Sequence, residues 1–516
     1  MKKPQLMFRS LTGLTLTLLA LTACAQGGSG ESGVKSTSFV AASTVNTLDP
    51  LLANTIQNDL VGDLLYDPLV DFTSDGKIIP RAASSWELAP DAKSVTLTLQ
   101  EGIKFTDGTP MTAKDVVFTL DRIKAAGTGV ASLLSSYASS AAVDERRVSI
   151  QLAAPNAAFV PALGKVYVLN STVVAAHAGA DNAQSWLAAN SAGSGAYTVD
   201  SFTQGSVVKM KINPNYWHAD KGRPDTFVIQ AFPETASAST GLRSGSVNLA
   251  QLPHQDVQKF QDKGKFSATK IDSGGATYVF FNTQKGVTAD PKVREAISLA
   301  YDYSSHLGTI LGGVGSLASQ IVSPSLGYSA GLPEPKQDLG RAKQLVKEAG
   351  ATGKQLTMLY QSARTDQTAA ATLLQSNLKE IGLELRLQTT TFPAYTALLS
   401  SVDTTPDLAI AGEFPRFPDP DALLSGMLDS KFVGKGSNKS QYANPEVDAL
   451  LVQARTTTDH ASRNALYTRI EKLVAADHAV MPISNTTWEL VATENVSGIV
   501  GNPARTLFDP MAIRVK

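Results

Sequence analysis

The sequence is poor in cysteine, in net charge and in long apolar runs. Its 516 residues contain one cysteine, Cys24, which excludes an internal disulfide. With 45 basic and 46 acidic residues the formal net charge is −1, so nothing indicates nucleic acid or an acidic lipid surface as a partner. The six histidines stand far apart, without the spacing of metal ligands, and no motif for a cofactor is present.

A short apolar segment follows a basic N-terminus. Lys2, Lys3 and Arg9 lie before or beside residues 11–21, which read LTGLTLTLLAL and carry no charge. A membrane-spanning helix needs roughly 20 apolar residues, so this segment has the length of a secretory signal rather than of a permanent anchor. Residues 21–24 read LTAC and resemble the lipobox of bacterial lipoproteins. The sequence therefore predicts a signal peptide over residues 1–23 and a lipid-modified Cys24.

The segment after Cys24 is rich in glycine and serine. Residues 24–38 have the composition of a flexible linker with almost nothing to bury, so we expect the folded part to begin near Phe39. Two acyl chains would hold such a protein on the cell membrane while the folded part stays in water. The predicted location is the extracellular or periplasmic side of the membrane, with contact to the membrane through the lipid anchor only.

The first half of the folded part is patterned for strands, and the second half for helices that alternate with strands. Apolar and hydroxyl side chains alternate over 95–99, and strand-rich sequence continues over 197–212. Apolar stripes at helical spacing, and buried or alternating runs, mark the second half. They predict helices over 290–301, 339–349, 368–381, 445–457 and 461–477, and strands over 383–387 and 407–411. Together these patterns predict an α/β fold.

Several short blocks resemble one protein family in their order and spacing. The blocks are YDPL at 66–69, DGKIIP at 75–80, ASSWE at 83–87, GIKFTDGTP at 102–110, AKDVV at 113–117, GSGAY at 193–197, NPNYW at 213–217, LRSGSVN at 242–248, FNT at 281–283 and DPKVREA at 290–296. This set resembles the family 5 extracellular solute-binding proteins, the peptide, nickel and opine receptors of ABC importers. The resemblance implies a receptor, not an enzyme, that delivers a small solute to the transmembrane subunits of an ABC permease.

The resemblance also implies a two-lobed fold of the periplasmic-binding-protein type with a two-segment hinge. Lobe I is expected over residues 39–275 and 485–516, with a strand-rich subdomain at roughly 80–195, and lobe II over 276–484. A ligand that binds between the lobes would favour their closed arrangement. We expect the protein to act as a monomer.

The binding site that the resemblance implies departs from the peptide-binding pattern. In peptide-binding members, an aspartate that follows a glycine and a tryptophan pairs with the ammonium group of the peptide. Here residues 412–421 read GEFPRFPDPD, so Glu413 stands at the tryptophan position and Arg416 at the aspartate position. A guanidinium group repels an ammonium group and suits a carboxylate, a phosphate, or a sugar or aromatic face. We expect Glu413, Phe414, Arg416 and Phe417 to contact the ligand, unless Glu413 and Arg416 only pair with each other.

Two further segments are candidates for ligand contact. Tyr360, Gln361 and Arg364 follow a predicted strand of lobe II, in a region that resembles the carboxylate-binding part of dipeptide receptors. Asn54 and Gln57 lie in an early segment of lobe I and offer amide groups.

The sequence leaves the identity of the ligand open. A peptide-like solute is expected, because an acidic side chain is still available for an amine, and an opine, another anionic solute or an oligosaccharide are the alternatives. An exported enzyme and a structural surface lipoprotein are further alternatives. The sequence has no GxSxG, HExxH or GxxxxGK[ST] motif, and its one cysteine is the predicted lipid site, which argues against the enzyme.

Overall fold

The computed structural model describes residues 35–41, 45–52, 55–218, 222–232, 235–262, 264–505 and 507–516. Lys35–Lys516 form one compact unit. Cys24, the predicted signal peptide and Asn54 lie outside the described residues.

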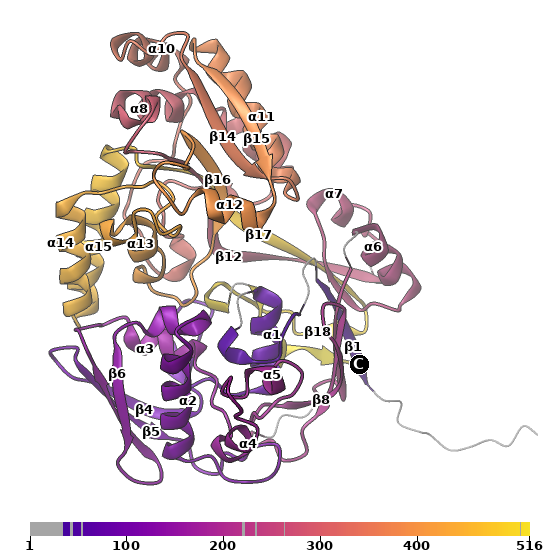
Figure 1. The fold of residues 1–516 in the computed structure, drawn as a ribbon. Helices are drawn as coiled ribbons and strands as arrows, with labels where there is room; N and C mark the ends of the chain where they lie inside the picture. Colours follow the sequence, from indigo (N-terminus) through magenta and orange to yellow (C-terminus); the bar gives the residue numbers. More distant parts are fainter. Residues whose placement is uncertain are drawn as a thin grey trace, which may run out of the picture. The chain divides into compact units, whose positions relative to one another are not determined.

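One mixed sheet runs through the described part of the chain, in the order β15-β14-β16-β12-β17-β11-β1-β10-β9-β8, with β13 paired to β17. Its two longest strands, β12 (Phe266–Phe281) and β17 (Val480–Thr493), pair with each other along their length. They lie in the middle of the sheet and connect its two halves, with β16 beside β12 on one side and β11 beside β17 on the other (Figure 1). We call the elements on the β11 side lobe I and those on the β16 side lobe II. The strands of lobe I are β1 (Ser36–Ala41), β8 (Tyr197–Thr203), β9 (Val207–Ile212), β10 (Thr226–Ala231) and β11 (Leu249–Gln251).

Lobe II is a sheet with helices on both faces. Alternate residues of β12 point to opposite faces, so Tyr278 and Phe280 join one core while Val279 and Phe281 join the other. One face carries α8 (Pro291–Ala300), α10 (Leu339–Glu348) and α11 (Thr365–Glu380); the other carries α12 (Phe392–Leu398), α13 (Asp421–Leu428), α14 (Pro445–Thr456) and α15 (His460–Ala476). The remaining elements are β13 (Ser316–Leu317), β14 (Gln355–Gln361), β15 (Glu384–Thr390), β16 (Leu408–Glu413) and α9 (Tyr303–Ser305).

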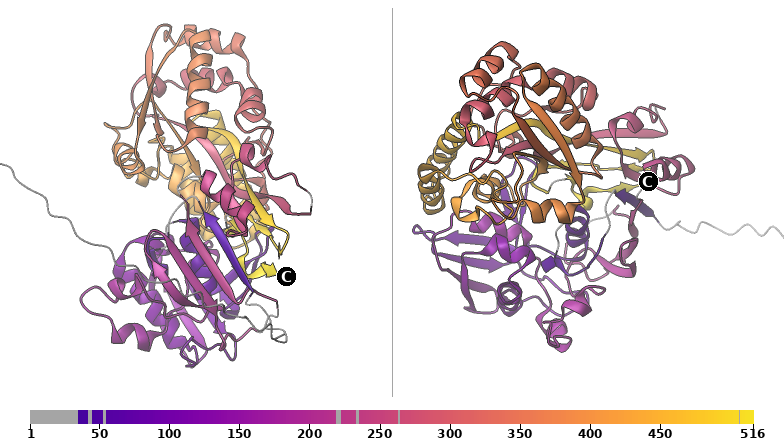
Figure 2. Two further views of the ribbon diagram at one scale, coloured as in Figure 1. Left: turned by 90° about the vertical axis from the view of Figure 1, so that its right-hand side faces the viewer. Right: turned by 45° about the horizontal axis from the view of Figure 1, so that its top comes forward.

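Lobe I holds a subdomain with its own antiparallel sheet and its own hydrophobic core. The sheet has the order β4-β5-β7-β6, and α2 and α3 pack on it (Figures 1 and 2). Its elements are β4 (Ala83–Leu88), β5 (Ser94–Leu99), β6 (Tyr137–Ala142), β7 (Arg147–Leu152), α2 (Ala113–Ala126) and α3 (Phe159–Ala162).

The remaining elements of lobe I are short. They are α1 (Ile56–Leu65), β2 (Val70–Phe72), β3 (Ile78–Pro80), α4 (Ser171–Ala176), α5 (Gln184–Leu187), α6 (Thr235–Ser244), α7 (His254–Val257), β18 (Val496–Ser497), β19 (Gly501–Asn502), β20 (Leu507–Phe508) and β21 (Arg514–Val515).

The helices and strands expected from periodicity are confirmed, with shifted ends. For example, α8 begins after Asp290, whose side chain accepts a hydrogen bond from the Lys292 N–H, as expected of an N-cap. α11 begins at Thr365, earlier than expected. β1 begins at Ser36, inside the segment expected to be a linker, because its backbone pairs with β10 and β11 and Thr37 is buried.

The helices in the described ranges are all too short or too polar to cross a membrane. The same residues hold no group of three or more His, Cys, Asp or Glu side chains placed to bind a metal ion.

Glu471 of α15 is a carboxyl group buried in lobe II. Its oxygens accept hydrogen bonds from the backbone N–H groups of Ile321 and Val322, both at 2.9 Å. Burial raises the pKa of Glu471 from 4.5 to about 7, although the two hydrogen bonds oppose the shift. Because the folded state holds this proton more tightly than the unfolded state, the contribution to stability is complete below pH 4.5 and is lost as the pH rises through 7.

His306 is a buried imidazole with the opposite behaviour. Its Nδ1 lies 2.8 Å from the Tyr301 hydroxyl, and its Nε2 lies 3.1 Å from the Ser484 hydroxyl. Burial lowers the pKa of His306 from 6.5 to about 4. Its contribution to stability is therefore present above pH 6.5 and is lost as the pH falls through 4.

We expect these two groups to mask each other in the pH dependence of stability. A pKa change of this size corresponds to about 3 kcal/mol. In Glu471→Gln the free energy of unfolding should fall by about that amount as the pH falls from 6.5 to 4, whereas in His306→Gln it should fall as the pH rises from 4.5 to 7. Urea unfolding at a series of pH values measures both slopes. If the free energy of unfolding changed with pH in the same direction in both variants, the pKa shifts assigned to Glu471 and His306 would be wrong.

Candidate functional site

The strands β12 and β17 change register where they pass between the lobes. The pairing shifts between Asp272 and Ala276. Gly274 has a φ of +71°, which favours glycine, and a Cβ on Gly275 would lie 2.3 Å from the ring of Phe414. The bulge and its glycines therefore bring the segment that follows β16 close to the crossing strands.

The ring of Phe414 stacks on Trp488 of β17, with centroids 5.6 Å apart and planes 21° apart. Phe414 directly follows β16 of lobe II, and Trp488 pairs with Ile271 in the lobe I part of β12. A ring pair of this kind contributes about 0.5–1.5 kcal/mol beyond the burial of its area. The stack fixes the start of residues 414–420, which we call the site segment.

Glu413 ends β16 and forms an ion pair with Lys439. The Lys439 Nζ lies 2.7 Å from the Glu413 Oε1, and it also lies over the ring of Phe280 at 5.6 Å from the centroid. Both charged side chains are partly buried. Glu413 is therefore a carboxylate whose charge is balanced within lobe II.

Arg416 makes a contact between the lobes. Its Nη2 lies 3.4 Å from the Oδ1 of Asp59, in α1 of lobe I, and the Asp59 Oδ2 accepts a hydrogen bond from the Lys165 Nζ at 3.0 Å. The side chain of Arg416 is 30% exposed and that of Asp59 is 8% exposed. Glu413 is thus paired with Lys439, and Arg416 is paired with Asp59.

Asp59 is the first of four buried carboxylates spaced four residues apart in lobe I. The others are Asp63, Asp67 and Asp71. Their cations within lobe I are Lys165 for Asp59, Arg81 for Asp67 at 2.9 Å, and Arg505 for both Asp63 and Asp71. In these ion pairs, three cations of lobe I face four carboxylates, and Arg416 of lobe II is the fourth cation.

Phe417 packs into lobe I. It is 4% exposed and belongs to the hydrophobic core of the subdomain, together with Val160 and Leu163. A second contact between the lobes lies nearby, where the Ala157 N–H donates to the Arg455 carbonyl at 2.8 Å. The sequence suggested ligand contact for Phe417, but its burial leaves almost no surface for a ligand, so we interpret it as a packing residue.

Tyr360 and Gln361 lie at the same edge of the sheet as Glu413. β14 and β16 run parallel, with Leu359 opposite Ala409, so both strands deliver their carboxyl ends to one edge. That edge is where open α/β sheets bind ligands. The resemblance and the topology therefore place the two segments of lobe II together.

Arg364 precedes α11, and its guanidinium group forms two hydrogen bonds with Asp366. The Nε lies 3.0 Å from the Asp366 Oδ1, and the Nη2 lies 2.7 Å from Oδ2. Burial alone would raise the pKa of Asp366, but the bonds to Arg364 lower it below 3.8. A ligand carboxylate at Arg364 would have to compete with this pair. Gln57 lies in α1, two residues before Asp59, and is buried.

Three residues of this site were not found from the sequence: Asp59, Lys439 and Trp488. Only Asp59 left a signal there, the spacing of four residues between successive aspartates from 59 to 71. Lys439 and Trp488 reach the site segment through the fold, from positions far along the chain.

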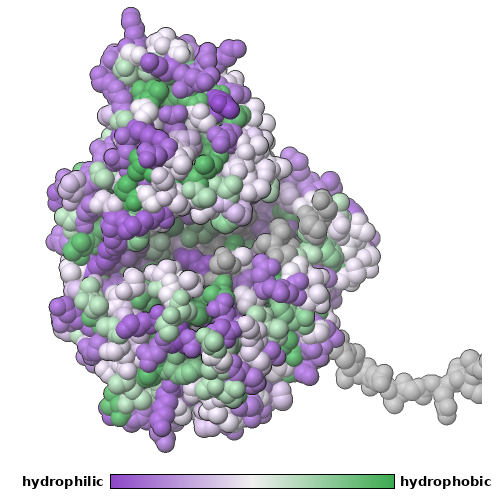
Figure 3. Space-filling model, in the orientation of Figure 1, coloured by the Kyte–Doolittle hydropathy of each residue, from purple (hydrophilic) through white to green (hydrophobic). Residues whose placement is uncertain are grey.

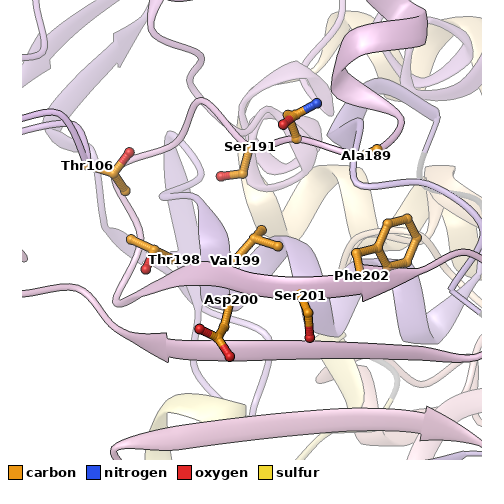
Figure 4. A pocket seen from close by; sticks show the side chains of 9 residues that line it. Thr106, Ala189, Ser191, Thr198, Val199, Asp200, Ser201 and Phe202 are labelled. Atoms are coloured by element: carbon orange, nitrogen blue, oxygen red, sulfur yellow. The ribbon is translucent and has the colours of Figure 1, made fainter.

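A polar pocket on lobe I is separate from these residues. Its volume is about 410 Å³, and its walls include Thr106, Ser191, Thr198 and Asp200 (Figure 4). Asp200 also pairs with Lys209 at 3.1 Å. Because all of its walls belong to lobe I, a ligand there would not join the lobes. The surface is also hollowed between the lobes (Figure 3). A second cavity is lined by residues of both lobes.

Comparisons with known proteins agree with this architecture. The family described as bacterial extracellular solute-binding proteins, family 5 (middle) matches residues 77–435. A probable D,D-dipeptide-binding periplasmic protein of Escherichia coli (strain K12) is 30% identical over 473 residues, which are 90% of this chain and 90% of that protein.

Solved structures show the same fold. The substrate-binding protein CtaP of Listeria monocytogenes has a TM-score of 0.83 at 24% identity and covers 93% of this chain and 99% of its own. The binding protein DppA of Helicobacter pylori, in complex with the peptide STSA, has a TM-score of 0.79 at 22% identity and covers 93% and 98%. The two-lobed fold and the family expected from the sequence blocks are confirmed. The chain belongs to family 5 of the bacterial extracellular solute-binding proteins, which are receptors of ABC transporters and not enzymes.

Proposed function

We propose that this receptor captures a peptide-like solute between its lobes and delivers it to the transmembrane subunits of an ABC permease. The observation that carries the proposal is the ion pair between Arg416 of lobe II and Asp59 of lobe I. This ion pair supports a site at which a small solute would contact charged groups of both lobes. The relatives described above, whose names refer to a D,D-dipeptide and to a peptide, support the same class of ligand.

The lobes are proposed to close about the bulge in β12. Lobe I would comprise residues 39–275 and 485–516 with the subdomain at roughly 80–195, and lobe II residues 276–484. The register shift between Asp272 and Ala276 interrupts the regular pairing of β12 with β17 at one place. A ligand that contacts both lobes stabilises the closed arrangement and shifts the population towards it.

The proposed ligand contacts lie around the site segment. Arg416 would bind a carboxylate of the ligand, and Asp59 would hold the guanidinium group in position. Glu413 would receive an amine, in competition with Lys439, and the ring of Phe414 would form an apolar wall. Secondary contacts would come from Tyr360, Gln361, Arg364 and Gln57, and from Asn54.

A non-peptide anionic ligand is the second candidate. Arg416 and Arg364 both lie close to the carboxyl ends of lobe II strands, and two guanidinium groups at one edge would suit an opine or another dianion. An oligosaccharide would stack on the Phe414 ring. An oligosaccharide offers no cationic amine to Glu413, and an opine carries its secondary amine between two carboxylates, so a library that varies the amine and the carboxylates separates these ligands from a peptide.

Attachment to the membrane is proposed to occur through Cys24. Signal cleavage before Cys24 and acylation of its sulfur would leave a segment rich in glycine and serine before β1, so a monomeric receptor could stay close to its permease on the extracellular or periplasmic side. The mass of the mature N-terminal peptide tests this proposal, since a thiol without a lipid would contradict it.

Ligand binding and lobe closure should occur together. We expect calorimetry with a di- and tripeptide library to show saturable binding to the mature protein, and small-angle scattering to show a smaller radius of gyration with ligand. An opine and oligosaccharide library serves as the comparison, and mass spectrometry of solutes that co-purify from the native host identifies the ligand directly. A protein that binds none of these solutes and stays rigid would contradict the proposed function.

A further inference from the structure

A cavity of about 660 Å³ lies between the subdomain of lobe I and lobe II. Lobe I contributes residues of β4, α3 and the turn before β3, and lobe II contributes residues 326–328, residues 418–420 and the start of α15. Neither Glu413, Phe414 nor Arg416 lines it. Its size lies within the range of about 300–1,000 Å³ that is common for small-molecule sites.

The strongest charges along this cavity are paired with each other. Arg463 of α15 forms two hydrogen bonds with the Asp419 carboxylate, at 2.6 and 2.8 Å, and both side chains are buried. Asp75 and Lys77 pair at 2.8 Å on the exposed side. Because each pair has no net charge, the cavity suits a ligand group that is itself uncharged.

The remaining walls are mainly apolar. Lobe I supplies Trp86 and Leu88 from one face of β4, and lobe II supplies the ring of Tyr328 and the two prolines Pro418 and Pro420. Aromatic and proline rings offer faces on which another ring or an aliphatic side chain can pack. Burying such a side chain away from water is favourable.

The cavity adjoins the proposed ligand site through the site segment. Arg416 and Pro418 are two residues apart, which corresponds to at most about 7 Å of extended backbone. Phe417, between them, is fixed in the core of lobe I. A ligand of two or three residues has the length to reach from Arg416 to the cavity.

We propose that this cavity receives an uncharged apolar or aromatic side chain of a peptide-like ligand whose charged end lies at Arg416. The inference rests on the proposed function, because it assigns a preference to the same ligand. Opposite walls of the cavity come from different lobes, so a side chain held there favours the closed arrangement. The receptor should therefore select short peptides by the apolar surface of one residue.

The test fills the cavity from lobe II. Asn464 lines it from α15 and is only partly buried, so Asn464→Trp adds a ring there with little effect on folding. Ala465→Trp is the matched control, because Ala465 is the next residue of the helix and is exposed to solvent. Thermal unfolding of both variants checks that the fold is intact.

The probes are trialanine and the three peptides in which one alanine is replaced by phenylalanine. We expect one phenylalanine position to raise the affinity of the wild type by at least about tenfold, and Asn464→Trp to abolish that gain without changing trialanine binding. Ala465→Trp should keep the gain. Equal losses for all four peptides in Asn464→Trp, or no gain in the wild type, would overturn the inference.

A neutral probe separates this inference from the proposed function. N-acetylphenylalaninamide carries an aromatic ring but no charged end, so it reports on the cavity alone. Saturation-transfer NMR should detect it on the wild type and on Ala465→Trp, but not on Asn464→Trp. If no peptide binds but the neutral probe binds to the wild type and not to Asn464→Trp, the proposed function fails and the cavity is still supported as an apolar site. If the probe does not distinguish the wild type from Asn464→Trp, the cavity is not an apolar site.

Discussion

Replacing Arg505 with methionine should lower the free energy of unfolding by about 3–5 kcal/mol. Arg505 lies in a 3-10 helix (Pro503–Arg505) after the second crossing strand, and its guanidinium group bridges Asp63, at 2.5 Å, and Asp71. All three side chains are about nine-tenths buried or more. Methionine keeps most of the packing volume but leaves two carboxylates in the interior without their cation, which is the costly way to break a buried ion pair.

The loss in Arg505→Met should be smaller at pH 5 than at pH 8. Burial already raises the pKa of Asp63 in the presence of Arg505, and loss of the cation raises it further. An acid whose pKa is raised in the folded state stabilises that state at low pH and loses this contribution as the pH rises, so protonation partly offsets the mutation in acid.

Urea unfolding of wild type and variant at both pH values measures this effect. Arg469→Met is the control, because Arg469 pairs with Glu446 on the surface, where an ion pair contributes at most about 1 kcal/mol. If the two variants unfold with the same free energy, the buried cluster does not hold the C-terminal segment to α1 as described.

Local sequence was enough to predict most elements of lobe II. The N-cap Asp290, the proline after it and an apolar stripe at helical spacing are all contained in the helix that they specify. β1 was harder to predict, because Ser36 and Thr37 have the composition of a linker. They become a strand only by pairing with β10, which lies almost 200 residues later in the chain.

The candidate site shows the same contrast between local and long-range information. Short motifs placed Arg416 after a buried strand, which is where it lies. Its partner Asp59 is 357 residues away in sequence, so no local pattern could reveal the contact between the lobes. Phe417 has the sequence character of a ligand-facing ring, and only the core of the subdomain in lobe I shows that it is buried.

Replacing Arg416 with methionine should weaken the binding of trialanine by at least about 30-fold, or about 2 kcal/mol. The reason is that Arg416 is proposed to bind the carboxylate of the ligand, and methionine cannot replace its donors. Trialanine amide lacks the carboxylate, so its affinity should be low for the wild type and nearly unchanged by the substitution. Calorimetry measures both peptides, and Arg386→Met, an exposed arginine of β15, is the control.

Asp59→Asn should weaken trialanine binding by about tenfold through its effect on Arg416, because the amide no longer balances the guanidinium charge. In the Arg416→Met background the same change should cost almost nothing, since a positioning residue matters only while the group that it positions is present. Lys165 loses its partner in both backgrounds, so its contribution cancels in the double-mutant cycle. Additive losses would show that Asp59 acts independently of Arg416. Unchanged trialanine affinity in Arg416→Met would remove the proposed anchor and leave the contact between Arg416 and Asp59 as a purely structural link between the lobes.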